Sequence, residues 1–177
     1  MHVRRSPWIA STVPLGFLVA LLGAWAFFVP LVGPYFSFGF DTDDAWSFTR
    51  LHWILSLAPG IVVFVGGLFM LMPLRAPAWV GGALALLGGA WLVVGPELYP
   101  VFSAGSVEPL AASEWKTALL WIGYFYGVGA LVVYLAGLAQ GLASSRPAVV
   151  EREPAGVEPE GEPGRVVEER NRTIVYP

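Results

Sequence analysis

The chain of 177 residues contains no cysteine, a single lysine and two histidines. Without cysteine it can form no disulfide, thiolate nucleophile, iron–sulfur cluster or cysteine-based zinc site. Charged residues make up only 13% of the sequence, and no basic patch is present that could hold nucleic acid. The composition therefore argues against several enzyme classes and against a nucleic-acid partner.

The sequence contains long apolar stretches without charged residues. Four stretches contain no Asp, Glu, Lys or Arg: residues 8–32, 51–74, 79–96 and 118–142. A bilayer core about 30 Å thick needs about 20 apolar residues per helix to cross it. Too little polar sequence remains to cover four such stretches in water. The sequence predicts an all-α protein with a polytopic four-helix transmembrane bundle over residues 1–142.

The remaining segment, residues 143–177, is a polar tail rich in Glu, Pro, Gly and Arg. We expect this acidic tail to be disordered, because it has too little apolar surface to offset the entropy of ordering. At the other end, the first apolar stretch is longer than the apolar region of a signal peptide and lacks an A-x-A cleavage site. We therefore expect it to be retained as the first transmembrane helix.

The basic residues of the short flanking segments predict the orientation. They precede the first helix, separate the second from the third and follow the fourth: Arg4, Arg5, Arg75 and Arg146. The two other loops, 33–50 and 97–117, are acidic. By the positive-inside rule, both termini are predicted to be cytoplasmic in a multi-pass protein of the plasma membrane. The strong preference for arginine over lysine is typical of a GC-rich bacterial genome.

The sequence contains a similar helical hairpin twice. The segment Leu21–Trp25 (LLGAW) recurs as Leu87–Trp91 (LGGAW), and Gly33-Pro34 is matched by Gly95-Pro96. Two membrane helices rich in Gly, Leu, Ala and Trp can also look alike without duplication. A true duplication predicts two parallel repeats related by an axis along the membrane normal.

Small residues recur at four-residue intervals on the predicted helices. This spacing lets helix backbones approach closely, which is how helices associate in lipid. Gly137 and Gly141 show the same spacing near the end of the fourth helix. Packing within the bundle or at a dimer contact is predicted for Gly16, Ala20, Ala24, Gly81, Ala85, Gly89, Gly123 and Gly127.

Ionisable residues inside a membrane mark ion or proton pathways, and this chain has almost none. A polar cluster at the outer face is the candidate site: His52, Glu97, Asp44, Arg50 and Lys116. His52 lies about 12 Å along a helix that begins at Asp44. It is either a titrating group or metal ligand facing the carboxylates, or an interfacial histidine bonded to a loop carbonyl. Glu97 either pairs with Arg50 or Lys116 or belongs to a substrate site.

The acidic segment 41–44 superficially suggests calcium. An EF-hand loop needs glycine at its sixth position and glutamate at its twelfth, whereas this chain has Trp46 and His52 there. We predict no metal-binding, cofactor-binding or catalytic residue.

Two Gly-x-Trp segments, Gly23-Ala24-Trp25 and Gly89-Ala90-Trp91, stand in the first helix of each hairpin. This pattern resembles the SPW-repeat family of small bacterial integral membrane proteins, in which the first helix of each pair carries a Gly-x-Trp pattern that is followed by a Ser-Pro-Trp break. Gly33-Pro34-Tyr35 and Gly95-Pro96-Glu97 stand where that break belongs, and the literal Ser6-Pro7-Trp8 precedes the first helix. The resemblance implies a fold and no reaction.

Three hypotheses for function follow. The first is a non-enzymatic integral membrane protein, an accessory or scaffold subunit that packs against a membrane partner or a second copy. The second is a small oligomeric transporter or channel, which needs a water-filled crevice reaching His52. The third is an outer-face enzyme, which needs His52 to converge with at least two carboxylates.

Overall fold

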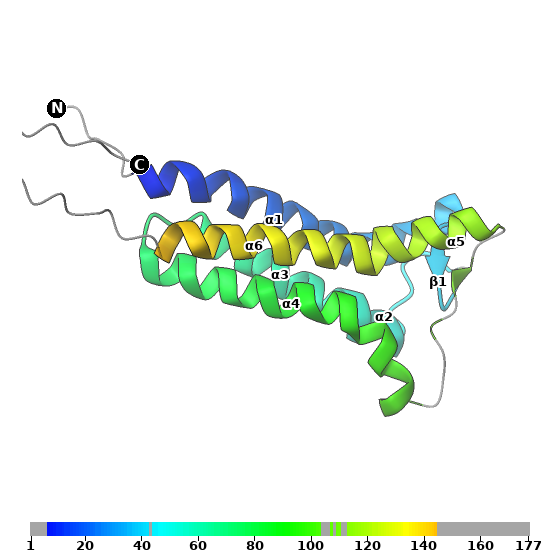
Figure 1. Cartoon of the computed structure of the whole chain (residues 1–177). Coiled ribbons are helices and arrows are strands. Elements are labelled where there is room, and N and C mark those ends of the chain that lie inside the picture. Colours follow the sequence, from blue (N-terminus) through cyan, green and yellow to red (C-terminus); the bar gives the residue numbers. More distant parts are fainter. Residues whose placement is uncertain (1–6, 43, 104–106, 108, 111–112, 145–177) are drawn as a thin grey trace, which may run out of the picture. The chain divides into compact units, whose positions relative to one another are not determined.

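The computed structural model describes residues 7–42, 44–103, 107, 109–110 and 113–144. Four helical segments are long and apolar enough to cross a membrane (Figure 1). The predicted all-α fold with four membrane-length helices is confirmed. The segments are α1 (Pro7–Val32), then α2 (Arg50–His52) continuing as η2 (Trp53–Leu57) and α3 (Ala58–Met70), then α4 (Arg75–Phe102), and finally α5 (Glu114–Trp121) continuing as η3 (Ile122–Tyr126) and α6 (Gly127–Ser144).

Two sequence predictions concern residues outside the described part of the chain. One is the orientation drawn from Arg4, Arg5 and Arg146, and the other is the tail from residue 145 onward. The first two residues of the predicted tail, 143 and 144, belong to α6.

The turn between the second and third helical segments is shaped by prolines. α3 ends at Met70, four residues before the predicted boundary. Pro73 follows closely, and a proline disfavours helical geometry in the residue before it. α4 begins at Arg75 with Pro77 in its first turn, where the missing N–H costs no helical hydrogen bond.

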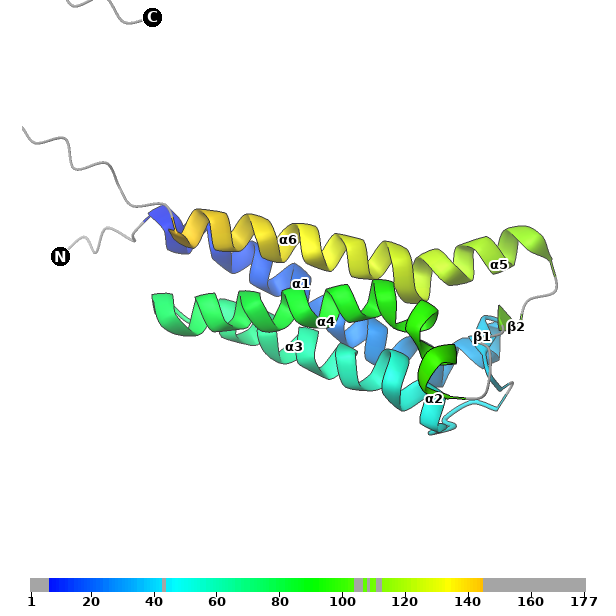
Figure 2. The same cartoon turned by 60° about the horizontal axis from the view of Figure 1, so that its bottom comes forward.

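The third apolar stretch ends at Gly95-Pro96, but the third helix does not end there. α4 runs through Gly95-Pro96 to Phe102, whereas α1 does end at Val32, directly before Gly33-Pro34. Transmembrane helices tolerate an internal proline because neighbouring groups satisfy the freed carbonyl. α4 changes direction near its end and diverges from α5 (Figures 1 and 2), as expected where a proline kinks a helix.

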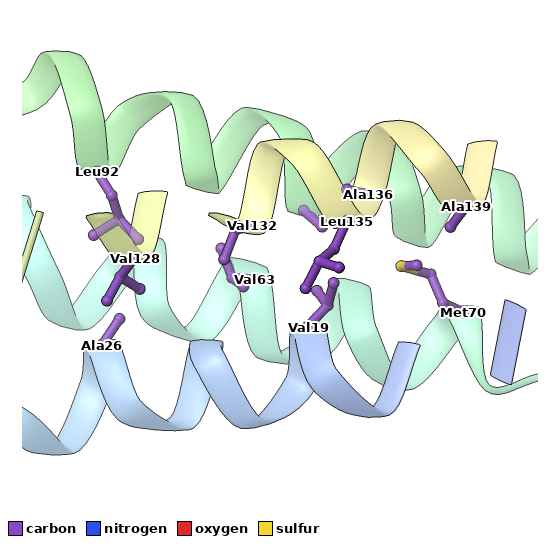
Figure 3. Packing of buried hydrophobic residues seen from close by; sticks show 11 residues of the cluster. Val19, Ala26, Val63, Met70, Leu92, Val128, Val132, Leu135, Ala136 and Ala139 are labelled. Atoms are coloured by element: carbon purple, nitrogen blue, oxygen red, sulfur yellow. The ribbon is translucent and has the colours of Figure 1, made fainter. Parts of the chain in front are cut away.

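The four segments pack in a ring around one apolar core. α1 and α4 each contact both α3 and α6, and the core side chains meet between them (Figure 3). This packing buries an entirely apolar set of residues: Val19, Ala26, Val63, Met70, Ala85, Leu92, Val128, Val132, Leu135, Ala136 and Ala139.

A second cluster fills the end of the bundle opposite Pro7 and Ser144, which we call the long-loop end. There β1 (Gly39–Phe40) pairs antiparallel with β2 (Pro109–Leu110), with Gly39 opposite Leu110 and Phe40 opposite Pro109. The pairing ties the two long loops together. The buried residues of this cluster are Val29, Phe40, Leu51, Leu55, Leu120, Tyr124 and Phe125.

Candidate functional site at the long-loop end

Phe40 closes the long-loop end from within. Its side chain is completely buried, and its ring makes edge-to-face contacts with the rings of His52, Tyr124 and Phe125 at centroid distances of 4.7, 5.1 and 5.1 Å. Aromatic pairs in this geometry contribute about 0.5–1.5 kcal/mol each beyond the area they bury. We call Phe40 and these three rings the aromatic plug.

His52 joins the plug to the loop before it. The side chain of Thr49, which caps α2, accepts a hydrogen bond from the His52 backbone N–H at 3.1 Å. The helix thus begins at Arg50 rather than at Asp44, and His52 lies in its first turn. The imidazole is fully buried, with Nδ1 2.9 Å from the Ser47 carbonyl oxygen and Nε2 2.9 Å from the Phe40 carbonyl oxygen.

Tyr124 holds the other side of the loop. Its hydroxyl lies 3.0 Å from the Val29 carbonyl oxygen and 2.5 Å from that of Phe38, and it can donate to either. A Cβ atom at Gly33 would lie 2.2 Å from this hydroxyl and 1.9 Å from the Phe38 oxygen. Only glycine therefore fits at the point where α1 passes into the loop.

The loop between α1 and α2 carries backbone strain. Ser37, Asp41 and Trp46 have positive φ values of 52°, 69° and 59°. The left-handed conformation is uncommon for any residue except glycine, and for a bulky residue such as Trp46 it is an outlier. Such conformations persist only where surrounding contacts enforce them. The Phe40 and Ser47 carbonyls, which face His52, each lie next to one of these strained residues.

Among the described residues, none of the other members of the predicted polar cluster forms a hydrogen bond or an ion pair with the His52 ring. The Tyr126 hydroxyl donates to Glu97 Oε1 at 2.5 Å, and the Trp121 ring stacks on Tyr126 at 5.5 Å. Within the described part of the chain, neither Arg50 nor Lys116 forms an ion pair with Glu97.

Of the acidic residues in segment 41–44, Asp41 and Asp44 belong to the described residues, and Asp43 lies outside them. The Asp44 backbone N–H donates to Thr42 Oγ1 at 3.1 Å, which closes a local turn. Among the described residues, no three His, Asp or Glu side chains are grouped so that they could hold a metal ion.

Sequence reasoning missed two π-helical turns, η2 and η3, in the second helix of each hairpin. The N–H of Ala58 donates to the Trp53 carbonyl, and that of Gly127 donates to the Ile122 carbonyl, each five residues back. The shift leaves the carbonyls of Ile54 and Gly123 without their usual partner four residues ahead. Pro59 was a signal for the first turn, because it has no N–H to offer.

Two tryptophans satisfy these carbonyls across the bundle. Trp91 Nε1 on α4 donates to the Ile54 carbonyl, and Trp25 Nε1 on α1 donates to the Gly123 carbonyl, both at 2.9 Å. Each tryptophan thus links the first helix of one hairpin to the second helix of the other. The sequence signal was the recurrence of Trp25 and Trp91 within the matched segments.

We expect Trp91→Phe to destabilise the bundle by about 0.6–1.7 kcal/mol, which spans the average and the maximum for hydrogen bonds between membrane helices. The substitution leaves the Ile54 carbonyl without its donor and keeps most of the aromatic surface. The free energy of unfolding in mixed detergent–SDS micelles measures the loss. Trp79→Phe is the control, because the Trp79 side chain is 54% exposed. Equal losses in both variants would contradict the assignment.

Several small residues predicted to pack helices do face a neighbouring helix. A Cβ atom at Gly16 would lie 2.8 Å from Met70 Cβ, and one at Gly81 would lie 2.4 Å from the Gly66 carbonyl oxygen. At Gly89 the nearest atom is Val132 Cγ1, at 2.8 Å. Ala20 and Ala85 are buried in the bundle.

The other three predicted packing residues lie elsewhere. Ala24 is half-buried and lines an apolar groove with Phe27, Phe28, Ile61 and Phe64. A Cβ atom at Gly123 would meet only the ring of Phe38, at 3.3 Å, and one at Gly127 would meet its own helix at Ile122.

The closest glycine contact between two transmembrane helices in the described part of the chain was not predicted. A Cβ atom at Gly23 would lie 2.3 Å from the Phe64 backbone nitrogen and 2.9 Å from the Gly60 carbonyl oxygen. By contrast, a Cβ atom at Gly137 or Gly141 would meet nothing within 4 Å. The same residue type thus lies in two different environments.

The sequence and the structure were also compared with known proteins. No protein-family model matches the chain, and neither the curated proteins nor the solved structures contain a match to it.

Proposed function

We propose that the protein is a non-enzymatic integral membrane protein that serves as an accessory or scaffold subunit. In this proposal it binds a transmembrane helix of a partner protein through one face of α6. The observation that carries the proposal is that this face places Gly137, beside which a Cβ atom would meet nothing within 4 Å, next to a tyrosine whose hydroxyl lies at membrane depth.

The α6 face contains an open apolar groove. Its volume is about 480 Å³, and its lining includes Val133, Tyr134, Gly137, Leu138, Gly141 and Leu142. Glycines four residues apart let a second helix approach the backbone closely, and the dispersion attraction between two such closely packed helices drives association in lipid. A partner helix with its own small residues would fit this groove.

Tyr134 supplies the second argument. It lies ten residues before the end of α6 at Ser144, about 15 Å along the helix, which is near the middle of a bilayer core about 30 Å thick. Its side chain is 62% exposed, and its hydroxyl has no hydrogen-bond partner within the described part of the chain. A hydroxyl surrounded by lipid tails is costly to leave unpaired. A carbonyl or polar side chain of a partner helix would accept its proton.

The test is a photo-crosslinking experiment on the full chain in its native membrane. A photoreactive residue placed at Val133 should capture a partner, whereas the same residue at Leu87, an exposed position on α4, should not. Gly137→Leu should reduce the captured fraction at least tenfold by filling the groove, and Tyr134→Phe should reduce it by a smaller factor. If Gly137→Leu does not change the captured fraction, the proposal is contradicted. If the captured protein is a second copy of this chain, the α6 face is a homodimer contact and the proposed binding to a different protein is wrong.

The geometry of His52 favours this function over the two alternatives. A transporter or an enzyme at this end would use the imidazole from a crevice or cleft. Here the ring is fully buried, and both nitrogens face loop carbonyl oxygens. The basic residues predicted to flank the cytoplasmic side support an orientation with the long-loop end outside and the termini inside.

We also propose that the bundle is a duplicated hairpin. Three features recur in the two halves: a π-helical turn in the second helix, a Trp-to-carbonyl bond across the bundle, and a close glycine contact. The glycine contact joins Gly23 to Gly60 in one half and Gly89 to Gly129 in the other. These matches support the duplication, and kinship with the SPW-repeat family stays a hypothesis that rests on the same Gly-x-Trp segments.

A further inference from the structure

We infer that the Glu97 carboxylate, held by Tyr126, binds the primary ammonium group of an ethanolamine phospholipid in the leaflet at the long-loop end. The headgroup donates to Glu97 Oε2, while the Tyr126 hydroxyl occupies Oε1. The inference concerns the contact between α4 and η3 and does not depend on the partner proposed for α6.

The first step is the depth of Glu97 in the membrane. The membrane-length segment begins at Arg75, and Glu97 lies 22 residues further along the same helix, which is about 33 Å. Tyr126 lies 18 residues before the end of α6 at Ser144, about 27 Å along the helix. A bilayer core is about 30 Å thick, so both residues lie near its boundary. The Glu97 side chain is exposed and therefore meets the lipid headgroups.

The second step is a count of the partners of this carboxylate. A carboxylate has two acceptor oxygens. The Tyr126 hydroxyl donates to Oε1 at 2.5 Å, whereas Oε2 has no hydrogen-bond or ion-pair partner within the described part of the chain. The last turn of α4 contains no basic residue, and a carboxylate near a helix C-terminus faces the negative end of the helix dipole. A cation from outside the chain would therefore be favoured at Oε2.

The third step is the way in which the carboxylate is held. Trp121 stacks on the Tyr126 ring, with centroids 5.5 Å apart and planes inclined by 25°. The stack orients the phenol, and the phenol orients Glu97 at the level where α4 and α5 diverge (Figures 1 and 2). A group that is already held in place loses less conformational entropy on binding. Tyr126 is thus a positioning residue, and Glu97 is the residue that contacts the headgroup.

The fourth step is the chemistry of the ligand. A primary ammonium has three N–H donors and can donate to Oε2, and hydrogen bonds between ionised groups are stronger than neutral ones. The quaternary ammonium of choline has no N–H and is typically bound in a cage of aromatic rings. Trp121 and Tyr126 stack on each other instead of forming such a cage. An anionic headgroup would be repelled by the carboxylate. These contacts favour ethanolamine over choline and glycerol headgroups.

The test is native mass spectrometry of the full chain, delipidated in maltoside micelles and titrated with phospholipids of identical acyl chains. We expect the apparent Kd of phosphatidylethanolamine to be about three- to fivefold lower than that of phosphatidylcholine, as for a favourable exposed ion pair. Phosphatidylglycerol should bind no better than phosphatidylcholine. Glu97→Gln keeps the shape of the side chain and removes its charge, so it should abolish the preference. Glu114→Gln, which removes an exposed carboxylate at the start of α5, should retain it.

Two further arms separate the parts of the inference. Tyr126→Phe keeps the aromatic ring and releases Oε1, so it should weaken the preference by a smaller factor than Glu97→Gln. Free ethanolamine at the lipid concentration should not displace the bound lipid, because it lacks the acyl chains that hold the headgroup at this depth. Equal affinity of wild-type protein for ethanolamine and choline lipids would overturn the inference, and this comparison needs no variant. Equal effects of Glu97→Gln and Glu114→Gln, or displacement by free ethanolamine, would also overturn it.

Discussion

A Gly23→Ala variant is expected to lose about 3 kcal/mol of its free energy of unfolding, although the change adds a single methyl group. The new Cβ would lie 2.3 Å from the backbone nitrogen of Phe64 and 2.7 Å from its Cα. Side chains can rotate away from such a clash, but the backbone of α3 cannot. The two helices must separate along their contact, and overpacking of this kind costs about 1–3 kcal/mol or more.

Gly137→Ala is the matched control for this experiment. Both glycines lie inside transmembrane helices, and both gain the greater helix propensity of alanine, up to about 1 kcal/mol. A Cβ at Gly137 meets nothing within 4 Å, so this variant should be as stable as the wild type or slightly more stable. Reversible unfolding in mixed detergent–SDS micelles, followed by circular dichroism, measures both variants. Equal stabilities would show that α1 and α3 are not packed as described.

This pair of glycines also shows how far the sequence predicts the fold. Length and apolar composition were enough to predict four membrane helices, because a bilayer imposes both. The four-residue spacing predicted that these glycines pack against another helix. The spacing defines a stripe on one helix, but it does not say which helix, if any, lies against that stripe. Gly81 faces α3, and Gly137 faces outward. The difference depends on the rotation of each helix in the bundle.

The candidate site was less predictable for a different physical reason. His52 was singled out as a polar residue near one end of the second helix, and a hydrogen bond to a loop carbonyl was one of its two alternatives. Its partners are two main-chain carbonyls, and main-chain groups have no sequence signature. Their positions depend on left-handed conformations at Ser37, Asp41 and Trp46. From sequence alone, the left-handed conformation is expected at glycine. None of these three residues is glycine, so no local feature of the sequence indicated the turn that buries Phe40.

A Phe40→Ala variant is expected to be destabilised by about 3–5 kcal/mol, the usual cost of removing a buried phenylalanine side chain. The loss leaves a cavity between the rings of His52, Tyr124 and Phe125, which all contact Phe40. It also removes the side chain that anchors β1, so the strained loop should open more readily. Thermal unfolding should therefore shift to lower temperature, and limited proteolysis should cleave within residues 33–49.

Phe36→Ala provides the comparison within the same loop. The Phe36 side chain is 75% exposed, so its truncation opens no cavity and should change the free energy of unfolding by about 0.5 kcal/mol or less. The contrast separates burial of Phe40 from any general effect of removing an aromatic residue from this loop. If both variants unfold alike and the loop resists protease in each, Phe40 does not close the bundle, and the rigidity of the long-loop end must come from the Tyr124 and His52 contacts with the loop backbone.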